Sequence, residues 1–143
     1  MTITLRHAES DAEIAVCFPV MRELRSELAS AAAFIAYVGR QHQFGYRLLA
    51  AWKDTEPVAL AGYRRQENLV HGAHLFVDDL VAAEGERGRR HGAHLLEAIA
   101  AEARTLRCRK VVLGTALANS RAQRFYYRQG MRATGLSFSL TLD

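Results

Sequence analysis

A turn rich in glycine and arginine is the stretch of this sequence whose residue types most directly suggest chemistry. Residues 86–92 read ERGRRHG, and an alanine-rich segment with apolar residues at helical spacing follows them. The first turn of a helix leaves backbone N–H groups without partners and carries a partial positive charge, so it attracts anions. Arginine side chains can add bidentate contacts to phosphate oxygens. The turn therefore predicts a binding site for a large, multiply charged anion.

Two well-known phosphate-binding motifs do not describe this turn. Gly85, Gly88 and Gly92 follow the pattern G-x-x-G-x-x-x-G, whereas a dinucleotide-binding fingerprint requires G-x-G-x-x-G. A P-loop requires a lysine followed by serine or threonine, and the turn contains no lysine. The anion site is therefore of another type.

Two adjacent carboxylates, Asp78 and Asp79, form a second candidate site. They interrupt an apolar segment, 73–82, which is predicted to be a central strand. A buried charge is costly unless it is paired or used, so each carboxylate needs a partner or a function. Because side chains alternate along a strand, we expect the two on opposite faces, with at most one facing an acceptor. The residues expected on the face of Asp78 are His74, Phe76 and Leu80.

The hydrophobic pattern predicts the elements that would hold these residues. The predicted strands are 3–6, 46–52, 57–65, 73–82, 110–115 and 135–142; the predicted helices are 11–28, 31–44, a helix from the glycine-rich turn to about 107, and 120–129. Ser10 or Asp11 would cap the first helix, and Pro19 predicts a kink or a break within it. This order predicts a mixed α/β sheet with helices on both faces.

Length and composition limit the class of protein. The 143 residues suffice for one domain, 1–143, with ordinary soluble composition: 50% hydrophobic and 24% charged residues. No apolar run approaches a membrane span, and the start has no signal-peptide pattern. Cys17 and Cys108 are too few for a disulfide framework, so we expect reduced thiols in a cytoplasm. The net charge of +4 fits an anionic small ligand or a weak nucleic-acid binder.

The turn and a second motif resemble one family. Residues 87–92 resemble the (R/Q)-x-x-G-x-(G/A) pyrophosphate loop of the GNAT superfamily of acyl-CoA N-acyltransferases, with Arg90 where the first motif glycine usually stands. A side chain there requires ordinary backbone angles and an outward direction. Residues 119–131 resemble the family's N-x-x-A-x-x-(L/F)-Y-x-x-x-G-(F/M) helix, at the family's distance from the first motif. The two motifs with their strands cover 75–131.

The resemblance implies both a fold and an activity. The fold would be a single GNAT domain with a mixed, mostly antiparallel central sheet of about six strands and helices on both faces. The activity would be transfer of an acetyl or other acyl group from acetyl-CoA to a primary amine, through a tetrahedral intermediate and without a metal. The implied cofactor-binding residues are Leu80, Val81, Ala82, Arg87, Gly88, Arg89, Arg90, His91, Gly92, Ala93 and Asn119.

Two residues receive catalytic roles from the resemblance. Tyr126 matches the family tyrosine that faces the thioester sulfur, and its phenol would protonate the departing thiolate. Asp78 is the candidate base, since family members often carry an acidic residue on this strand at the same parity. Other readings stay open: one aspartate pairs with Arg64 or Arg65 for structure, Glu67 is the base, or a chain of waters removes the proton.

Rival functions have less support. Two H-x-x-H pairs, at 71–74 and 91–94, could suggest a metal site, but a strand does not aim positions i and i+3 at one ion. A basic nucleic-acid-binding module would use the turn and the arginines at 121, 124 and 128, but the sequence has no recognised binding motif. A catalytically silent acyl-CoA-binding regulator would share the fold. The expected partner is a small-molecule or peptide amine, without a membrane, and a homodimer is compatible with this reading.

Overall fold

The protein is described by a computed structural model that covers residues 2–143. The chain divides into two compact units, one ending at Val112 and one spanning Leu113–Asp143. The first contains β1 (Ile3–His7), α1 (Asp11–Leu24), α2 (Ala31–His42), β2 (Arg47–Lys53), β3 (Glu56–Asn68), β4 (Gly72–Ala82), α3 (His91–Thr105) and nearly all of β5 (Lys110–Leu113). The second contains α4 (Ser120–Arg128).

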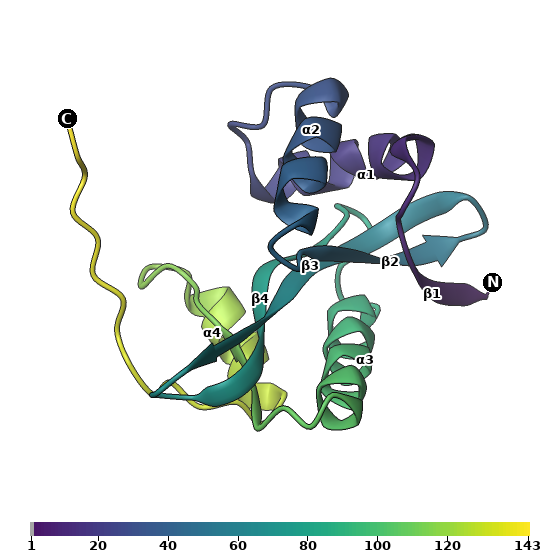
Figure 1. The fold of residues 1–143 in the computed structure, drawn as a ribbon. Coiled ribbons are helices and arrows are strands. Elements are labelled where there is room, and N and C mark those ends of the chain that lie inside the picture. The colour runs from purple at the N-terminus through teal and green to yellow at the C-terminus, as the bar shows by residue number, and fades with distance from the viewer. Residues whose placement is uncertain (1) are drawn as a thin grey trace. The chain divides into compact units, whose positions relative to one another are not determined.

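The strands form one five-stranded sheet in the order β1-β2-β3-β4-β5. The pairings from β1 to β4 are all antiparallel. Helices α1 and α2 lie on one face of these strands and α3 lies on the other (Figure 1). The mixed α/β architecture predicted from the sequence is therefore confirmed, with five strands in place of about six.

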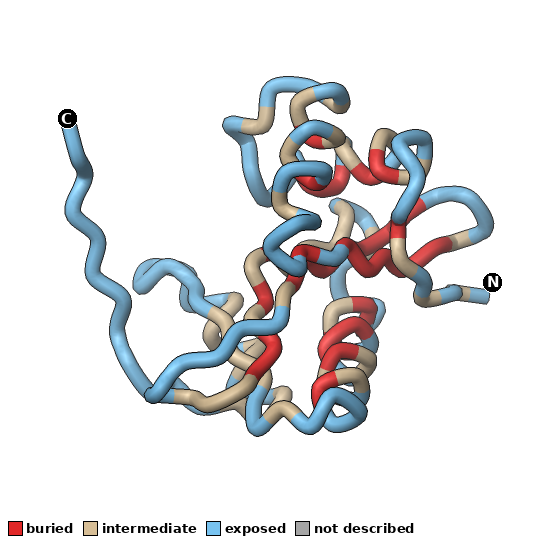
Figure 2. Tube along the Cα trace, viewed as in Figure 1, coloured by how far each residue is buried: buried red, intermediate tan, exposed pale blue. Residues whose placement is uncertain are grey.

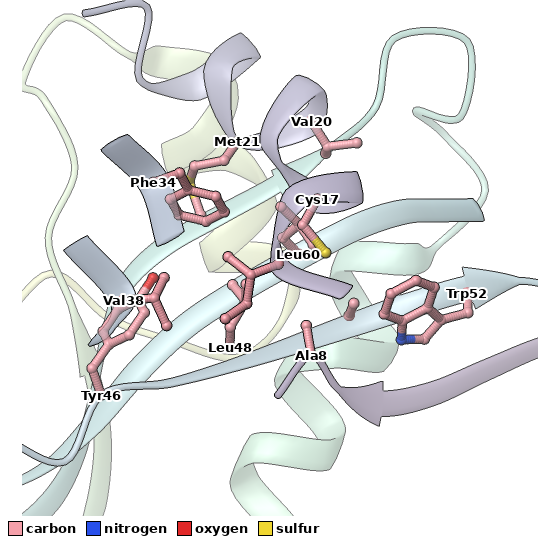
Figure 3. Close-up of a cluster of buried hydrophobic side chains, with 12 residues drawn as sticks. Ala8, Cys17, Val20, Met21, Phe34, Val38, Tyr46, Leu48, Trp52 and Leu60 are labelled. Carbon is pink, nitrogen blue, oxygen red and sulfur yellow. The ribbon is translucent and has the colours of Figure 1, made fainter. Parts of the chain in front are cut away.

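Apolar residues fill both faces of the sheet in the first unit. Figure 2 shows the buried stretches concentrated along the strands and on the side of α3 that faces them. On the face of α1 and α2, the side chains of Cys17, Phe34, Trp52 and Leu60 belong to one cluster (Figure 3). Each large apolar side chain removed from water contributes about 1.5–3 kcal/mol, so this packing fixes the position of both helices.

The start of α1 follows from local sequence. Ser10 accepts a hydrogen bond from the Glu13 N–H at 3.1 Å, and the Glu13 side chain accepts one from the Ser10 N–H at 3.2 Å. This capping box confirms Ser10 as the helix cap. The predicted break at Pro19 is wrong: α1 continues to Leu24. Proline removes only one helical donor, and the buried Cys17, Val20 and Met21 hold the helix against the sheet on both sides of it.

The predicted strand at 135–142 is also wrong. The structure assigns no strand there, and its apolar side chains are exposed: Leu136, Phe138, Leu140 and Leu142. Alternating apolar residues show that a segment could pair in a sheet, but a strand forms only where a neighbouring strand supplies its hydrogen bonds. No described segment pairs with 135–142, which accounts for the missing sixth strand.

Candidate active site

A β-bulge in β4 sets the directions of the two aspartates. Gly62 of β3 lies opposite Asp79, and the next residue, Tyr63, lies opposite Val77, so Asp78 is the extra residue of the bulge. A bulge interrupts the alternation of side chains. Both carboxylates consequently lie on the face covered by α1 and α2. The prediction that they lie on opposite faces is wrong, because it assumed a regular strand.

Asp79 is buried and bonded on both oxygens. The Arg25 Nε donates to its Oδ1 at 2.9 Å, and the Tyr46 hydroxyl donates to its Oδ2 at 2.9 Å. Burial, followed by the charge of Asp79, raises the pKa of Tyr46 well above its ordinary value, so this phenol stays a neutral donor. The close approach also explains Gly62: a Cβ there would lie 1.9 Å from the Tyr46 hydroxyl and 2.7 Å from Asp79 Oδ2.

Asp78 is half-buried and pairs with the preceding strand. The Arg64 Nε donates to its Oδ2 at 2.8 Å, and the Arg64 Nη1 donates to the Gln41 Oε1 of α2 at 2.9 Å. Burial raises the pKa of Asp78, although the hydrogen bond and charge of Arg64 act in the opposite direction. The structural pairing that the sequence suggested for Arg64 or Arg65 is thus formed by Arg64. Glu67 lies exposed, 3.9 Å from Arg65.

A cavity of about 300 Å³ opens beside Asp79, and Asp78 is not among the residues that line it. It lies where α1 connects to α2, and its lining residues are Met21, Arg25, Glu27, Leu28, Phe34, Tyr37, Tyr46 and Asp79. The walls are largely apolar with a few polar groups, as is usual for small-molecule sites. Arg25, Tyr37 and Tyr46 could not be assigned to this site from the sequence, because no motif or spacing connects them to β4.

The glycine-rich turn after β4 contains three residues with left-handed backbones. Gly85 and Gly88 have φ of 87° and 83°, and Arg90 has φ of 66° and ψ of 17°. Glycine adopts such angles freely, whereas an L-residue is strained there. The condition of ordinary backbone angles at Arg90 is therefore not met. Its side chain does point outward, with 67% exposure and a Glu97 oxygen at 3.6 Å.

The start of α3 has the geometry of an anion site. Arg90 is the N-cap residue and makes no side-chain cap hydrogen bond. The first bond of the helix runs from the His94 N–H to the Arg90 carbonyl at 3.0 Å. The N–H groups of His91, Gly92 and Ala93 precede that bond and are left for another acceptor. Together with the exposed arginines of the turn, this arrangement fits a phosphate group.

Glu86 ties the turn to the rest of the first unit. The Lys53 Nζ at the end of β2 lies 3.0 Å from its Oε2, and the His91 Nε2 lies 3.0 Å from its Oε1. Hydrogen bonds from His91 and then from Lys53 lower the pKa of Glu86. The His91 Nδ1 is buried without a hydrogen-bond partner among the described residues. Sequence reasoning missed Glu86, because its role depends on a lysine on a distant strand.

The three residues before the turn, Leu80, Val81 and Ala82, are half-buried at the end of β4. On one edge they pair with Ala61, Leu60 and Ala59 of β3. In the sheet order β5 follows β4, and the Arg109 N–H before β5 donates to Ala73 O at the other end of β4, at 2.7 Å.

The second unit carries the remaining predicted residues. Asn119 caps α4, its Oδ1 accepting from the Ala122 N–H at 3.1 Å. Tyr126 is half-buried, with its ring edge-on to Phe125 at 5.5 Å, whereas Tyr127 is 58% exposed. This difference separates the two neighbouring tyrosines as the helical period requires.

Among the described residues there is neither a metal-binding group nor a membrane-spanning helix, and both cysteines are free. Residues 2–143 contain no group of three or more His, Cys, Asp or Glu that could hold a metal ion. Cys17 and Cys108 are free thiols, and burial raises the pKa of Cys17 to about 12. In that same range, no helix is both long and apolar enough to cross a membrane.

A family model, a relative and several similar solved structures are named as acetyltransferases. The sequence profile of the acetyltransferase (GNAT) family matches residues 11–131. The chain is 30% identical over 124 residues to "Uncharacterized N-acetyltransferase YhdJ" of Bacillus subtilis, covering 87% of each chain. Its fold is similar to that of the aminoglycoside N-acetyltransferase AAC(6')-Iy in complex with CoA, with a TM-score of 0.86, 15% identity, and 99% and 95% of the two chains covered. Glucosamine-6-phosphate N-acetyltransferase from Arabidopsis thaliana gives a TM-score of 0.76 and 18% identity over the whole of both chains.

Proposed function

Since the chain belongs to the acetyltransferase (GNAT) family and acetyl-CoA is the co-substrate of that family, we propose that it moves an acetyl group from acetyl-CoA to a primary amine. The observation that carries the proposal is the uncapped N-terminus of α3 after a turn with three left-handed residues. This start of a helix can surround a pyrophosphate with N–H groups. Bound acetyl-CoA would supply a thioester carbonyl for the amine to attack.

The proposed binding residues follow the order of the chain. The N–H groups from Arg87 to Ala93 would bind the pyrophosphate, assisted by the side chains of Arg87, Arg89 and Arg90. The backbone of Leu80, Val81 and Ala82 would bond the pantetheine arm through the edge that β3 does not use. Asn119 would act near the arm, in addition to capping α4.

The proposed proton transfers use Asp78 and Tyr126. An amine of lysine type has a pKa near 10.4, so a base must remove its proton before attack. The raised pKa of Asp78 makes its carboxylate a stronger proton acceptor than a solvated aspartate. Tyr126 would donate a proton to the leaving thiolate. The support for Tyr126 is its place in the motif and its half-buried position.

A catalytically silent acyl-CoA-binding protein is the second candidate. The observation in its favour is that Asp78 and Asp79 are each already paired with an arginine. A carboxylate engaged in a structural pair is less available as a base. The two free thiols are consistent with a reducing compartment for either candidate.

The decisive experiment measures release of CoA thiol from acetyl-CoA with a panel of amines. Turnover supports the transferase, whereas CoA binding without turnover on any amine supports the silent protein. The Tyr126→Phe variant should lower kcat by roughly 10²–10⁴-fold with little change in CoA affinity, and Tyr127→Phe should have little effect. A Tyr126→Phe enzyme with normal kcat would remove that residue from the mechanism.

Binding at the turn is tested separately. CoA should raise the melting temperature more than dephosphorylated pantetheine does, because only CoA carries the pyrophosphate. Gly92→Val should abolish most of that difference. Equal stabilisation by the two ligands would contradict the role of the turn.

A further inference from the structure

We propose that the acceptor is a monoamine with an apolar body, such as an arylalkylamine, and that it binds in the cavity between α1, α2 and β4. The inference rests on the proposed function and specifies the substrate class of the same site. It follows from the shape, the lining and the charges of the cavity.

The walls of the cavity suit an apolar or aromatic group. Met21 and Phe34 are 2% and 1% exposed and form its floor with Tyr46. The rings of Tyr37 and Tyr46 meet edge to face, with centroids 5.8 Å apart and an interplanar angle of 80°. Burial of an apolar body against these side chains is favourable, and a ring face attracts an ammonium group. A volume of about 300 Å³ admits a single aromatic ring with a short chain.

Among the carboxylates in and beside the cavity, one is left to pair with an ammonium group of the ligand. Asp79 is compensated by Arg25, and the neighbouring Asp78 is compensated by Arg64. Glu27 is the remaining lining carboxylate, and no described residue forms an ion pair with it. One uncompensated negative charge matches one positive charge on the ligand.

A polycation fits this site poorly. Each additional ammonium group that enters the cavity would lose water without gaining a carboxylate, which costs free energy. The same reasoning disfavours an acceptor with its own carboxylate, because the charge of Arg25, the lining cation, is already compensated by Asp79 at 2.9 Å. We therefore expect discrimination against polyamines, aminoglycosides and amino acids.

The first test compares acceptors by CoA release at fixed acetyl-CoA. The value of kcat/KM for 2-phenylethylamine should exceed the values for spermidine, neamine and phenylalanine by about tenfold or more, the scale expected when a buried charge lacks a partner. Preference for any of the other three would overturn the inference while leaving the transferase function intact.

A binding measurement separates this inference from the failure of catalysis. Calorimetric titration of the CoA complex with 2-phenylethylamine should show saturable binding, and 2-phenylethanol should bind more weakly because it lacks the ammonium group. Binding without turnover would support the inference and contradict the transferase function. An absence of binding would overturn the inference.

A substitution then tests the assigned charge. Glu27→Gln should lower the affinity ratio of amine to alcohol by up to roughly fivefold, as for an exposed ion pair, without changing the affinity for CoA. Glu56→Gln, a substitution of an exposed residue at the start of β3, is the matched control and should leave the ratio unchanged. An unchanged ratio in Glu27→Gln would remove Glu27 from amine recognition.

Discussion

The pKa of Asp78 in the β4 bulge and the pKa of Glu86 in the glycine-rich turn are shifted in opposite directions. Asp78 has a single side-chain partner, Arg64, and burial raises its pKa. Glu86 accepts hydrogen bonds from His91 and Lys53, and these lower its pKa. The balance between lost hydration and donated hydrogen bonds therefore decides whether a carboxylate can exchange a proton or remains a fixed charge. By this criterion Asp78 is suited to proton transfer and Glu86 to holding the turn.

The largest effect should come from removing Asp78, the proposed proton acceptor. Asp78→Asn keeps the shape and the bond to Arg64, so we expect an intact fold and a kcat roughly 10²–10⁴-fold lower in steady-state CoA release. Asp79→Asn is the matched control. It should retain most of kcat but lose about 1–3 kcal/mol of unfolding free energy in urea, because it weakens the bonds with Arg25 and Tyr46. The reverse pattern would exchange the roles of the two aspartates.

A smaller effect should follow from loosening the turn. Glu86→Gln weakens the contacts with Lys53 and His91, so the turn should bind CoA roughly fivefold more weakly, comparable to the loss of one hydrogen bond. Calorimetric titration with CoA measures this change. Glu84→Gln changes an exposed carboxylate of the same turn that forms no ion pair with a described residue, and it should not alter the affinity. Equal affinities for Glu86→Gln and the wild type would mean that the turn holds its form without this anchor.

Backbone strain in the turn predicts a stabilising substitution. Arg90→Gly places a glycine at a position with left-handed backbone angles. It should raise the unfolding free energy by up to about 1 kcal/mol, because glycine avoids the clash of Cβ with the backbone. Arg89→Gly should lower it, since the backbone of Arg89 does not have a positive φ and glycine there only adds freedom to the unfolded chain. Denaturation curves of both variants distinguish these outcomes. Destabilisation by Arg90→Gly would show that its side chain matters more than its backbone angle.

The smallest expected effect is a difference in the pH dependence of stability. The raised pKa of Asp78 means that the folded state binds its proton more tightly, so its contribution to stability falls as pH rises above its ordinary value of 3.8. The lowered pKa of Glu86 has the opposite sign, and its contribution is lost as pH falls below 4.5. Relative to wild type, Asp78→Asn should therefore gain stability with rising pH, and Glu86→Gln should lose it. Parallel curves between about pH 3 and pH 6 would contradict both pKa directions.

Features that depend on neighbouring residues could be predicted from the sequence. The capping box of Ser10 and Glu13 spans a few residues, so the start of α1 follows from local hydrogen bonds. The same holds for the start of α3, where a glycine-rich turn precedes an apolar stripe of helical period. The two motifs that predicted the family also lie within short segments, and the family match confirms that prediction.

Only the tertiary structure decided the surroundings of the carboxylates. Arg25 reaches Asp79 across 54 positions of the chain, and Lys53 reaches Glu86 across 33. The bulge at Asp78 depends on the register with β3, and the absence of a strand at 135–142 depends on the lack of a pairing partner. Local sequence sets backbone preferences and caps because those interactions are short in range. Register, burial and charge pairing depend on which distant segments meet, and so they arise only when the chain has folded.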